Sequence, residues 1–417
     1  LQPGSCIYRL LSQHNMLWVG KRSYSMYLWH FPLISLCKWT VGINYLTSLF
    51  VLVATVVLSQ ITFVYVENPI RFSSSKFPGF QTILLALSMI AISSAFLRGV
   101  LARPSNQLYL GTRAKSFEAV VPSPINYKGE ITQRIARECH SSDTPKNDAL
   151  NGRYMISDRD FSKCLATKHR DMPLLAFVGD SHTLSMFPIS EKLFRSYPID
   201  VFSHSRDGCA FPEQGQVVRR GCREVMESVE KRVIEEVFLR KKNSVVVLTS
   251  FLNSHYGYQG VHRFQFKKHP SGSTTDVNSN LSDYILSVKR LAKTLQEARA
   301  SVVLVAPFPQ FKSFTVQECL PQPFKPRWSL SSHCFYEKRV DLNAERLHIL
   351  LELRKLQSQS SNIYVYDPFP ALCTQDVCST SSGSKYYYSD SSHLSYDGAS
   401  RMYPAFTAFL RLHHLLP

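Results

Sequence analysis

The chain has 417 residues, a net charge of +17 and 44% apolar residues, and this length allows two or three domains of ordinary size. Its 48 basic residues are scattered singly, in pairs and in one run of three, without the basic arm or stripe that a nucleic acid requires. We therefore expect no nucleic-acid partner, and a basic surface that faces anionic lipid or an anionic polymer.

Three apolar segments near the start of the chain predict membrane-spanning helices. They cover residues 24–39, 45–66 and 81–97. The second is the clearest, because it contains no charged residue and matches the about 20 residues that cross a bilayer. A buried globular helix fits any one of them, but three in succession favour membrane insertion. A cleaved signal peptide does not explain more than one apolar segment.

The basic residues around these segments predict their orientation. Lys21 and Arg22 precede the first segment, and Arg71 and Lys76 lie between the second and the third. Cytoplasmic loops retain Lys and Arg, so three crossings place everything after residue 98 outside. We expect a multi-pass membrane protein in contact with membrane lipid, with its following domain on the periplasmic, luminal or extracellular side.

Residues 99–170 predict a linker and an irregular leading segment. They contain Pro104, Pro122, Pro124 and Pro145 among many Ser, Asn and Asp residues, and they show little periodicity. The chain starts with Leu1 rather than Met, which indicates a fragment or a processed form.

Eight of the ten cysteines follow the apolar segments and predict disulfides in an oxidising compartment. The simplest pairing is sequential, joining positions 139 with 164, 209 with 222, 319 with 334, and 373 with 378. A zinc site is disfavoured, because these cysteines form no Cys-x-x-Cys pair. The disulfides agree with the orientation inferred from the basic loops.

From residue 173 onward, short apolar runs alternate with amphipathic stretches. The expected strands cover residues 174–178, 200–203, 244–249, 301–306 and 363–366, and the expected helices cover 183–194, 223–241, 282–299 and 341–356. This alternation predicts a mostly parallel sheet covered by helices on both faces, an α/β/α three-layer domain over residues 171–417.

A serine follows the first predicted strand, in Gly179-Asp180-Ser181-His182. A serine at a strand-to-helix turn is exposed, and the helix amino terminus offers N–H groups to a developing oxyanion. Asp and Ser are also good helix caps. The motif alone therefore fits a cap and a nucleophile equally well.

A second motif near the carboxy terminus favours the nucleophile. Asp390 precedes His393 by three residues, a spacing at which the carboxylate orients the imidazole and stabilises its protonated form. We therefore predict that Ser181 is the nucleophile, His393 the general base and Asp390 the residue that orients it. Asp180 is expected to shape the turn.

These motifs resemble the SGNH hydrolase superfamily (a flavodoxin-like fold), in the version fused to acyltransferase-3 membrane domains. The resemblance rests on residues 179–182 and 390–395, and on two membrane motifs. Residues 20–33, GKRSYSMYLWHFPL, are similar to a helix of that family, and residues 66–71, VENPIR, to its closing signature. The four motifs occur in the family's order. Residues 1–98 would then be the last helices of a truncated acyltransferase-3-like domain.

The resemblance implies an O-acyltransferase that transfers an acyl group other than an amino-acyl group, usually acetyl, to a carbohydrate acceptor at the cell surface. In that family, the membrane domain takes the acetyl group from acetyl-CoA, and the SGNH domain transfers it through a seryl ester. An esterase that deacylates such glycans, or a non-catalytic glycan-binding relative, stays as an alternative. The membrane helices favour transfer, because a plain esterase does not need them.

Two departures from the family pattern affect these expectations. The early helices with the acyl-CoA site are missing, so this chain is expected to bind no cofactor itself and to depend on helices of a longer parent chain. The oxyanion-hole candidates are Gly208 and Asn253. Gly208 fits the family's glycine block, whereas the segment around Asn253 lacks the Gly-x-Asn-Asp pattern. Backbone N–H groups are the alternative donors.

Overall fold

In the computed structural model, the chain forms two compact units. One unit comprises Leu1–Val121 and Gln317–Ser331, and the other comprises Pro122–Val316 and Ser332–Pro417. The structure describes residues 12–69, 79–101, 134, 138–141, 158–169, 171–212, 222–240, 243–252, 277–315, 319–320, 334–383 and 385–417.

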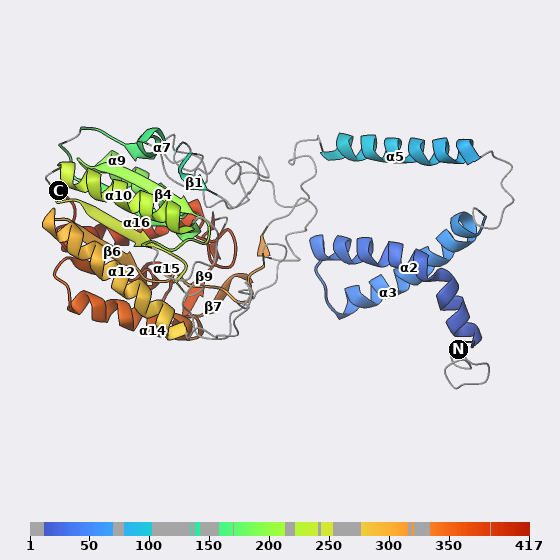
Figure 1. Ribbon diagram of the computed structural model, residues 1–417. Helices are drawn as coiled ribbons and strands as arrows, with labels where there is room; N and C mark the ends of the chain where they lie inside the picture. Colours follow the sequence, from blue (N-terminus) through green and yellow to red (C-terminus); the bar gives the residue numbers. More distant parts are fainter. Residues whose placement is uncertain are drawn as a thin grey trace. The chain divides into compact units, whose positions relative to one another are not determined.

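The helical unit contains three described helices (Figure 1). They are α2 (His14–Trp39), α3 (Tyr45–Thr62), which continues into the π-helix η1 (Phe63–Glu67), and α5 (Gly79–Leu101). Asn44 caps α3, where its side chain accepts the N–H of Thr47 while the Thr47 hydroxyl accepts the N–H of Asn44.

Hydrogen bonds between polar side chains join α2 to the continuous helix formed by α3 and η1. Ser25 donates to Glu67 at 2.6 Å, and the indole N–H of Trp29 donates to Thr62 at 2.8 Å. Arg22 bonds the side chain of Gln60. These contacts are buried or half-buried between the helices, where unpaired polar groups would be costly.

One helical stretch among the described residues, Tyr45–Glu67, is long and apolar enough to cross a membrane. It corresponds to the clearest of the three predicted spans. The other two segments are helical and lie within α2 and α5, and the described part of α5 includes the shorter apolar helix Leu87–Gly99. The basic residues of α2 lower its hydropathy.

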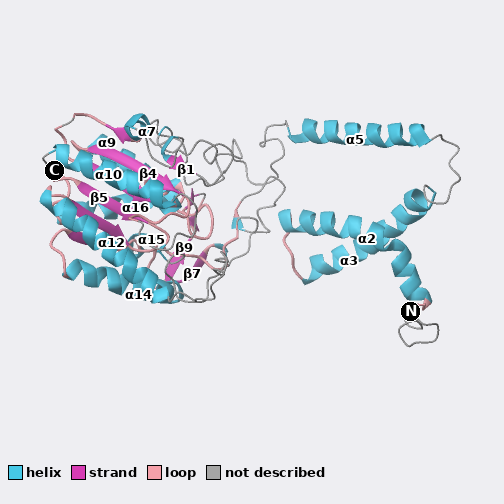
Figure 2. Cartoon of the chain, in the orientation of Figure 1, coloured by secondary structure: helices cyan, strands magenta, loops and turns pink. Residues whose placement is uncertain are grey.

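The second unit is built on a seven-stranded sheet (Figure 2). Its strands are β1 (His140–Ser141), β2 (Leu165–Ala166), β3 (Leu174–Gly179), β4 (Asp200–Arg206), β5 (Val245–Thr249), β6 (Ser301–Val305) and β8 (Ile363–Tyr366). The strand order is β1-β4-β3-β5-β6-β8, all parallel, and β2 pairs antiparallel with β4. The five central strands therefore follow the doubly wound order 2-1-3-4-5.

Helices cover this sheet and connect its strands. They are α7 (Asp158–Lys163), α8 (Ser181–Leu184), α9 (Phe187–Ser196), α10 (Cys222–Arg240), α12 (Val277–Glu297), α14 (Arg339–Ser358), α15 (Phe369–Leu372) and α16 (Tyr396–Leu412). Two small antiparallel pairs join β7 (Tyr336–Lys338) to β9 (Val377–Ser379), and β10 (Ser381–Ser382) to β11 (Lys385–Tyr386).

Side chains of β3 alternate between two cores. Ala176 and Val178 pack in a cluster with α10, α12 and α14, while Phe177 points to the other face and contacts Phe406 of α16, with ring centroids 6.3 Å apart. Strands β3, β5 and β6 are apolar and buried along almost their whole length, as a parallel sheet under two helical layers requires. The predicted three-layer architecture is confirmed for this unit.

The predicted strands and helices of this unit are recovered within a few residues, with one correction. The expected helix over residues 183–194 is two helices, α8 and α9. Pro188 lies in the first turn of α9, where its missing N–H and fixed φ are tolerated. A single helix would place this proline in its interior.

Three of the predicted disulfides are present: Cys139–Cys164, Cys209–Cys222 and Cys373–Cys378. Cys319 and Cys334 are also disulfide-bonded. Among the described residues, Cys37 in α2 is a free, buried thiol.

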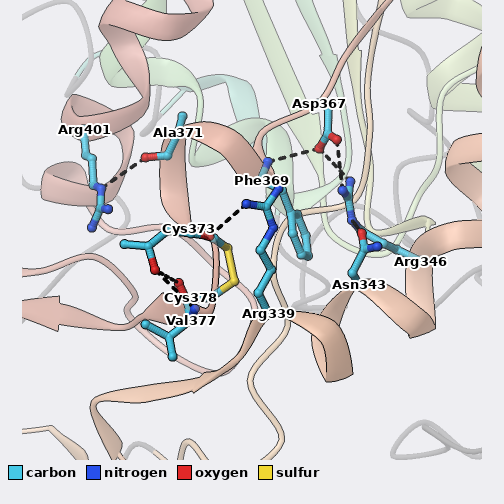
Figure 3. Close-up of a disulfide and its surroundings, with 11 residues drawn as sticks. Arg339, Asn343, Arg346, Asp367, Phe369, Ala371, Cys373, Val377, Cys378 and Arg401 are labelled. Atoms are coloured by element: carbon cyan, nitrogen blue, oxygen red, sulfur yellow. Dashed lines mark hydrogen bonds and ion pairs between the residues drawn. A yellow bond between two sulfur atoms is a disulfide. The ribbon is translucent and has the colours of Figure 1, made fainter.

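The segment after β8 is held by arginines around the Cys373–Cys378 disulfide (Figure 3). Arg346 forms two bonds to Asp367, at 2.7 and 3.0 Å, and its guanidinium lies 3.5 Å from the ring centroid of Phe369. Arg339 donates to the carbonyl oxygen of Thr374 at 2.8 Å. Bidentate and stacked arginine contacts fix orientation, so the chain leading to the carboxy-terminal motif is anchored.

Candidate active site

The turn after β3 requires a glycine. Gly179 has φ +155°, and a Cβ added there would lie 1.9 Å from the carbonyl oxygen of Thr249 on the neighbouring strand. The hydroxyl of Thr183 donates to the same oxygen at 2.6 Å. Only a residue without a side chain allows this approach, which brings the next residues to the carboxyl edge of the sheet.

Asp180 caps the short helix α8. Its Oδ1 accepts the N–H of His182 at 2.8 Å, and its Oδ2 accepts the N–H of Phe251, beyond β5, at 2.6 Å. The residue is 1% exposed. The capping interpretation of the motif therefore holds for Asp180, and it leaves the hydroxyl of Ser181 available for chemistry.

The structure brings Ser181, His393 and Asp390 together. The Nε2 atom of His393 lies 2.8 Å from Oγ of Ser181, and its Nδ1 atom lies 2.7 Å from Oδ2 of Asp390. Oδ1 of Asp390 accepts the backbone N–H groups of Ser392 and His393, each at 2.8 Å. Nδ1 therefore carries the proton toward Asp390, and Nε2 faces the serine as an acceptor.

Charges around the triad favour a strong base. Burial works against the charged form of His393, but the hydrogen bond and charge of Asp390, with the charges of Asp180 and Asp207, raise the pKa of His393 above its ordinary value. Burial likewise opposes the Asp390 carboxylate, yet the His393 ring and two backbone N–H groups lower the pKa of Asp390 to about 2. The aspartate is therefore ionised whenever the histidine acts as a base.

His182 is a further residue of the site to which the sequence assigned no role. It is 3% exposed, and its ring stacks on that of His393, with centroids 4.5 Å apart. The His182 ring also contacts the rings of Phe251 and Phe308, whose centroids lie 4.4 and 5.7 Å from its own. Burial, and then the nearby charge of His393, lower the pKa of His182. A buried ring whose neutral form is favoured thus packs against the ring of His393. The position of His182 beside Ser181 in the motif was the available sequence signal.

Of the two predicted oxyanion-hole residues, Gly208 lies among the described residues and Asn253 does not. Gly208 lies in the turn after β4 with φ +67°, a conformation that suits glycine. Asn253 lies outside the described residues. The N–H of Ser181 is in the first turn of α8, where N–H groups have no intrahelical acceptor. Both Ser181 and Gly208 thus remain candidates as backbone donors.

The arrangement holds no preformed metal centre in the part of the chain that the structure describes. No group of three or more His, Cys, Asp or Glu side chains is placed to bind a metal ion there. The chemistry that the described side chains support is nucleophilic attack by a hydroxyl, assisted by an imidazole.

A serine, histidine and aspartate in this geometry, at the end of the first central strand of a doubly wound sheet, define the class of serine-dependent esterases and acyltransferases. The family described as "SGNH domain (fused to AT3 domains)" matches residues 138–408, more than half of the chain. The chain belongs to this family.

Curated relatives and a solved structure show similarity over parts of the chain. The peptidoglycan O-acetyltransferase OatA of Listeria monocytogenes is 32% identical over 84 residues, which cover 19% of this chain and 14% of that protein. The O-acetyltransferase OatA of Staphylococcus aureus is 30% identical over 112 residues, covering 23% and 19%. The periplasmic domain of a Salmonella Paratyphi A lipopolysaccharide acetyltransferase aligns at 14% identity and a TM-score of 0.43, covering 70% of this chain and 98% of that one.

Proposed function

We propose that this chain is an O-acyltransferase that transfers an acyl group, most simply acetyl, to a hydroxyl of an extracytoplasmic glycan through an ester on Ser181. The observation that carries the proposal is the continuous series Ser181–His393–Asp390, with contacts of 2.8 and 2.7 Å. The names of the Listeria and Salmonella relatives indicate peptidoglycan and lipopolysaccharide as glycan classes for a first acceptor panel. The matched segments are less than a fifth of the length of the two OatA relatives.

The reaction has two balanced halves. His393 accepts the proton of Ser181 as Oγ attacks the donor's carbonyl carbon, and the oxyanion forms near the first turn of α8. The bond to the leaving group then breaks, and that group takes the proton from His393. In the second half, His393 accepts the proton of a sugar hydroxyl, whose oxygen attacks the seryl ester. The new ester leaves, and Ser181 recovers its proton.

The membrane part supports the location of this reaction. We propose a multi-pass chain in contact with membrane lipid, with its α/β unit on the extracytoplasmic side. The apolar stretch Tyr45–Glu67 and the disulfides of the α/β unit support it. The acyl donor on the cytoplasmic side would be acetyl-CoA, bound by helices of a longer parent chain. Its acceptor would be carbohydrate rather than nucleic acid.

The test uses the full chain in lipid nanodiscs, made in an oxidising host, and follows hydrolysis of p-nitrophenyl acetate. Ser181→Ala and His393→Ala should each abolish turnover. Ser358→Ala and His169→Ala, which remove an exposed serine and an exposed histidine of the same unit, should retain it. Each assay is repeated with muropeptides and lipopolysaccharide-derived oligosaccharides, and acetylated sugar is measured by mass spectrometry.

Each outcome separates the candidate functions. Loss of turnover in both site variants, with acetyl on a sugar, supports the transferase. Loss of turnover with no sugar product across the panel favours the esterase, which resolves the same ester with water. Turnover that survives Ser181→Ala would refute the proposed site.

A further inference from the structure

A second histidine–aspartate pair lies on the sheet edge beside the triad. In His140, on β1, Nδ1 lies 2.9 Å from Oγ of Ser205 on β4, and Nε2 lies 3.5 Å from Oδ1 of Asp207, just beyond β4. The side chain of His140 is 16% exposed and that of Asp207 is 32% exposed. An Nε2–H tautomer suits both neighbours, because Ser205 can then donate to Nδ1 while Nε2–H faces the carboxylate.

Strand register places this pair next to the nucleophile. His140 pairs with Ser205, and Ser205 pairs with Gly179 across neighbouring parallel strands. Asp207 and Ser181 each follow one of these paired residues by two positions. Adjacent strands are about 4.8 Å apart, so the turn of Asp207 and Gly208 runs beside the turn that carries the serine. The charge of Asp207 also acts on His393 and raises its pKa.

The pair is not a second nucleophilic site, although its residue types repeat those of the triad. Ser205 is completely buried, so its hydroxyl cannot meet an ester carbonyl from solvent. Its bond to His140 instead fixes the imidazole ring from the strand side. The ring is then aimed at Asp207, the residue immediately before Gly208.

Disulfides hold both partners of this contact. Cys139, immediately before His140, is bonded to Cys164, and Cys209, immediately after Gly208, is bonded to Cys222. The short strand β1 has only two residues, so its own ladder fixes it weakly. The two disulfides and the contacts of His140 therefore tether the Asp207–Gly208 turn from both sides.

We propose that His140 is a positioning residue that holds the Asp207–Gly208 turn so that the N–H of Gly208 serves as an oxyanion donor to the ester on Ser181. This inference rests on the proposed seryl-ester function. It assigns His140 no contact with substrate, because the residue acts through Asp207. Removing one oxyanion donor costs about 10²- to 10³-fold in kcat, and a displaced donor should cost less.

The experiment measures the same three rates on the full chain in nanodiscs for each variant. They are p-nitrophenyl acetate hydrolysis, acetyl transfer to a sugar, and the rate at which a fluorophosphonate modifies Ser181, followed by intact mass. We expect His140→Ala to lower the kcat of hydrolysis about 10- to 100-fold, with KM within twofold. Transfer and labelling should fall by a similar factor, and His140→Gln should recover part of the loss because its amide can still donate to Asp207.

The matched control is His169→Ala, which removes an exposed histidine whose Nδ1 lies 3.2 Å from Asp171. It should leave all three rates unchanged. The double variant His140→Ala with Asp207→Asn should lose little more than the worse single variant, because the two residues act through one contact. Losses that multiply would refute that coupling.

Other outcomes separate this inference from the proposed function. If only sugar transfer falls in His140→Ala, the pair contacts the acceptor and the positioning role is wrong. If all three rates survive while Ser181→Ala abolishes them, the inference fails and the seryl-ester mechanism stands. If Ser181 of the folded wild-type chain is neither labelled nor required for hydrolysis, the proposed function fails, and the inference fails with it.

Discussion

Replacing Asp180 with alanine tests whether the residue before the nucleophile acts by building the turn. Its buried carboxylate accepts two backbone N–H groups, from His182 at 2.8 Å and from Phe251 at 2.6 Å. A hydrogen bond to a charged group contributes about 1.5–3 kcal/mol, so the pair contributes roughly 3–6 kcal/mol. Removing a buried charge recovers part of this. We expect Asp180→Ala to lower the free energy of unfolding by about 3–5 kcal/mol.

Replacing Asp180 with asparagine separates the effect of the lost hydrogen bonds on stability from the effect of the lost negative charge on His393. Asp180→Asn keeps one acceptor oxygen but turns an NH₂ group toward the second N–H, so we expect roughly half of the alanine loss. It also removes a negative charge that raises the pKa of His393. His393 must be neutral to accept a proton, so kcat/KM rises as pH rises through its pKa. In Asp180→Asn this acidic limb should move to lower pH.

The assay is pulse proteolysis of the full chain in detergent across a urea series, with kcat/KM for p-nitrophenyl acetate measured against pH in parallel. Asp171→Ala is the matched control, because Asp171 is 80% exposed in its pair with His169. Exposed pairs contribute about 0–1 kcal/mol. An Asp180→Ala variant as stable as this control would refute the capping account. An acidic limb that stays in place in Asp180→Asn would refute the electrostatic one.

Three further predictions concern the rest of the site and its support. Gly179→Ala should destabilise the chain by more than about 3 kcal/mol by pulse proteolysis, because its Cβ would lie 1.9 Å from the backbone oxygen of Thr249; a stable, active variant would contradict this geometry. Asp200→Ala should cost about 3–5 kcal/mol in the same assay, because it removes the fully buried carboxylate that pairs with the buried guanidinium of Arg240. The other carboxylate partner of Arg240, Glu236, lies 3.4 Å away and is only partly buried. A loss below about 1 kcal/mol would contradict this account. Asp390→Asn should lower kcat by about 10⁴-fold, as loss of the aspartate does in serine proteases. It should also move the acidic limb of kcat/KM to lower pH, because Asp390 raises the pKa of His393. A limb at unchanged pH would show that His393 is not the titrating base.

The sheet and the triad could be predicted because their signals are local. Each central strand is a short apolar run bounded by polar residues, and each long helix has its own amphipathic pattern. The motifs that carry Ser181 and His393 are read within a few residues, and strands in parallel order bring their carboxyl ends to one edge. The motifs predict that these two side chains meet, whereas the contact distance of 2.8 Å is known only from the structure.

The flanking residues could not be predicted, because their contacts are not local. His140 meets Ser205 across 65 positions of sequence. Its strand has only two residues, in a segment whose prolines and polar residues predict a linker. The ring stack of His182 depends on where His393 arrives from the far end of the chain. Sequence period and composition carry no information on such pairings.

Three carboxylates raise the pKa of His393, and each comes from a different turn of the α/β unit. Asp180 follows β3, Asp207 follows β4, and Asp390 precedes α16. In the proposed mechanism, at a pH above the pKa of His393, the imidazolium that they stabilise forms when Ser181 gives up its proton. Their attraction is then stronger in the transition state than in the resting site. The backbone N–H groups of Ser181 and Gly208 are the candidate donors that would stabilise the negative charge developing on the ester oxygen. The doubly wound sheet brings both sets of groups to one edge. There, the three carboxylates lie in loops near His393, and the candidate backbone donors lie in the turns after β3 and β4.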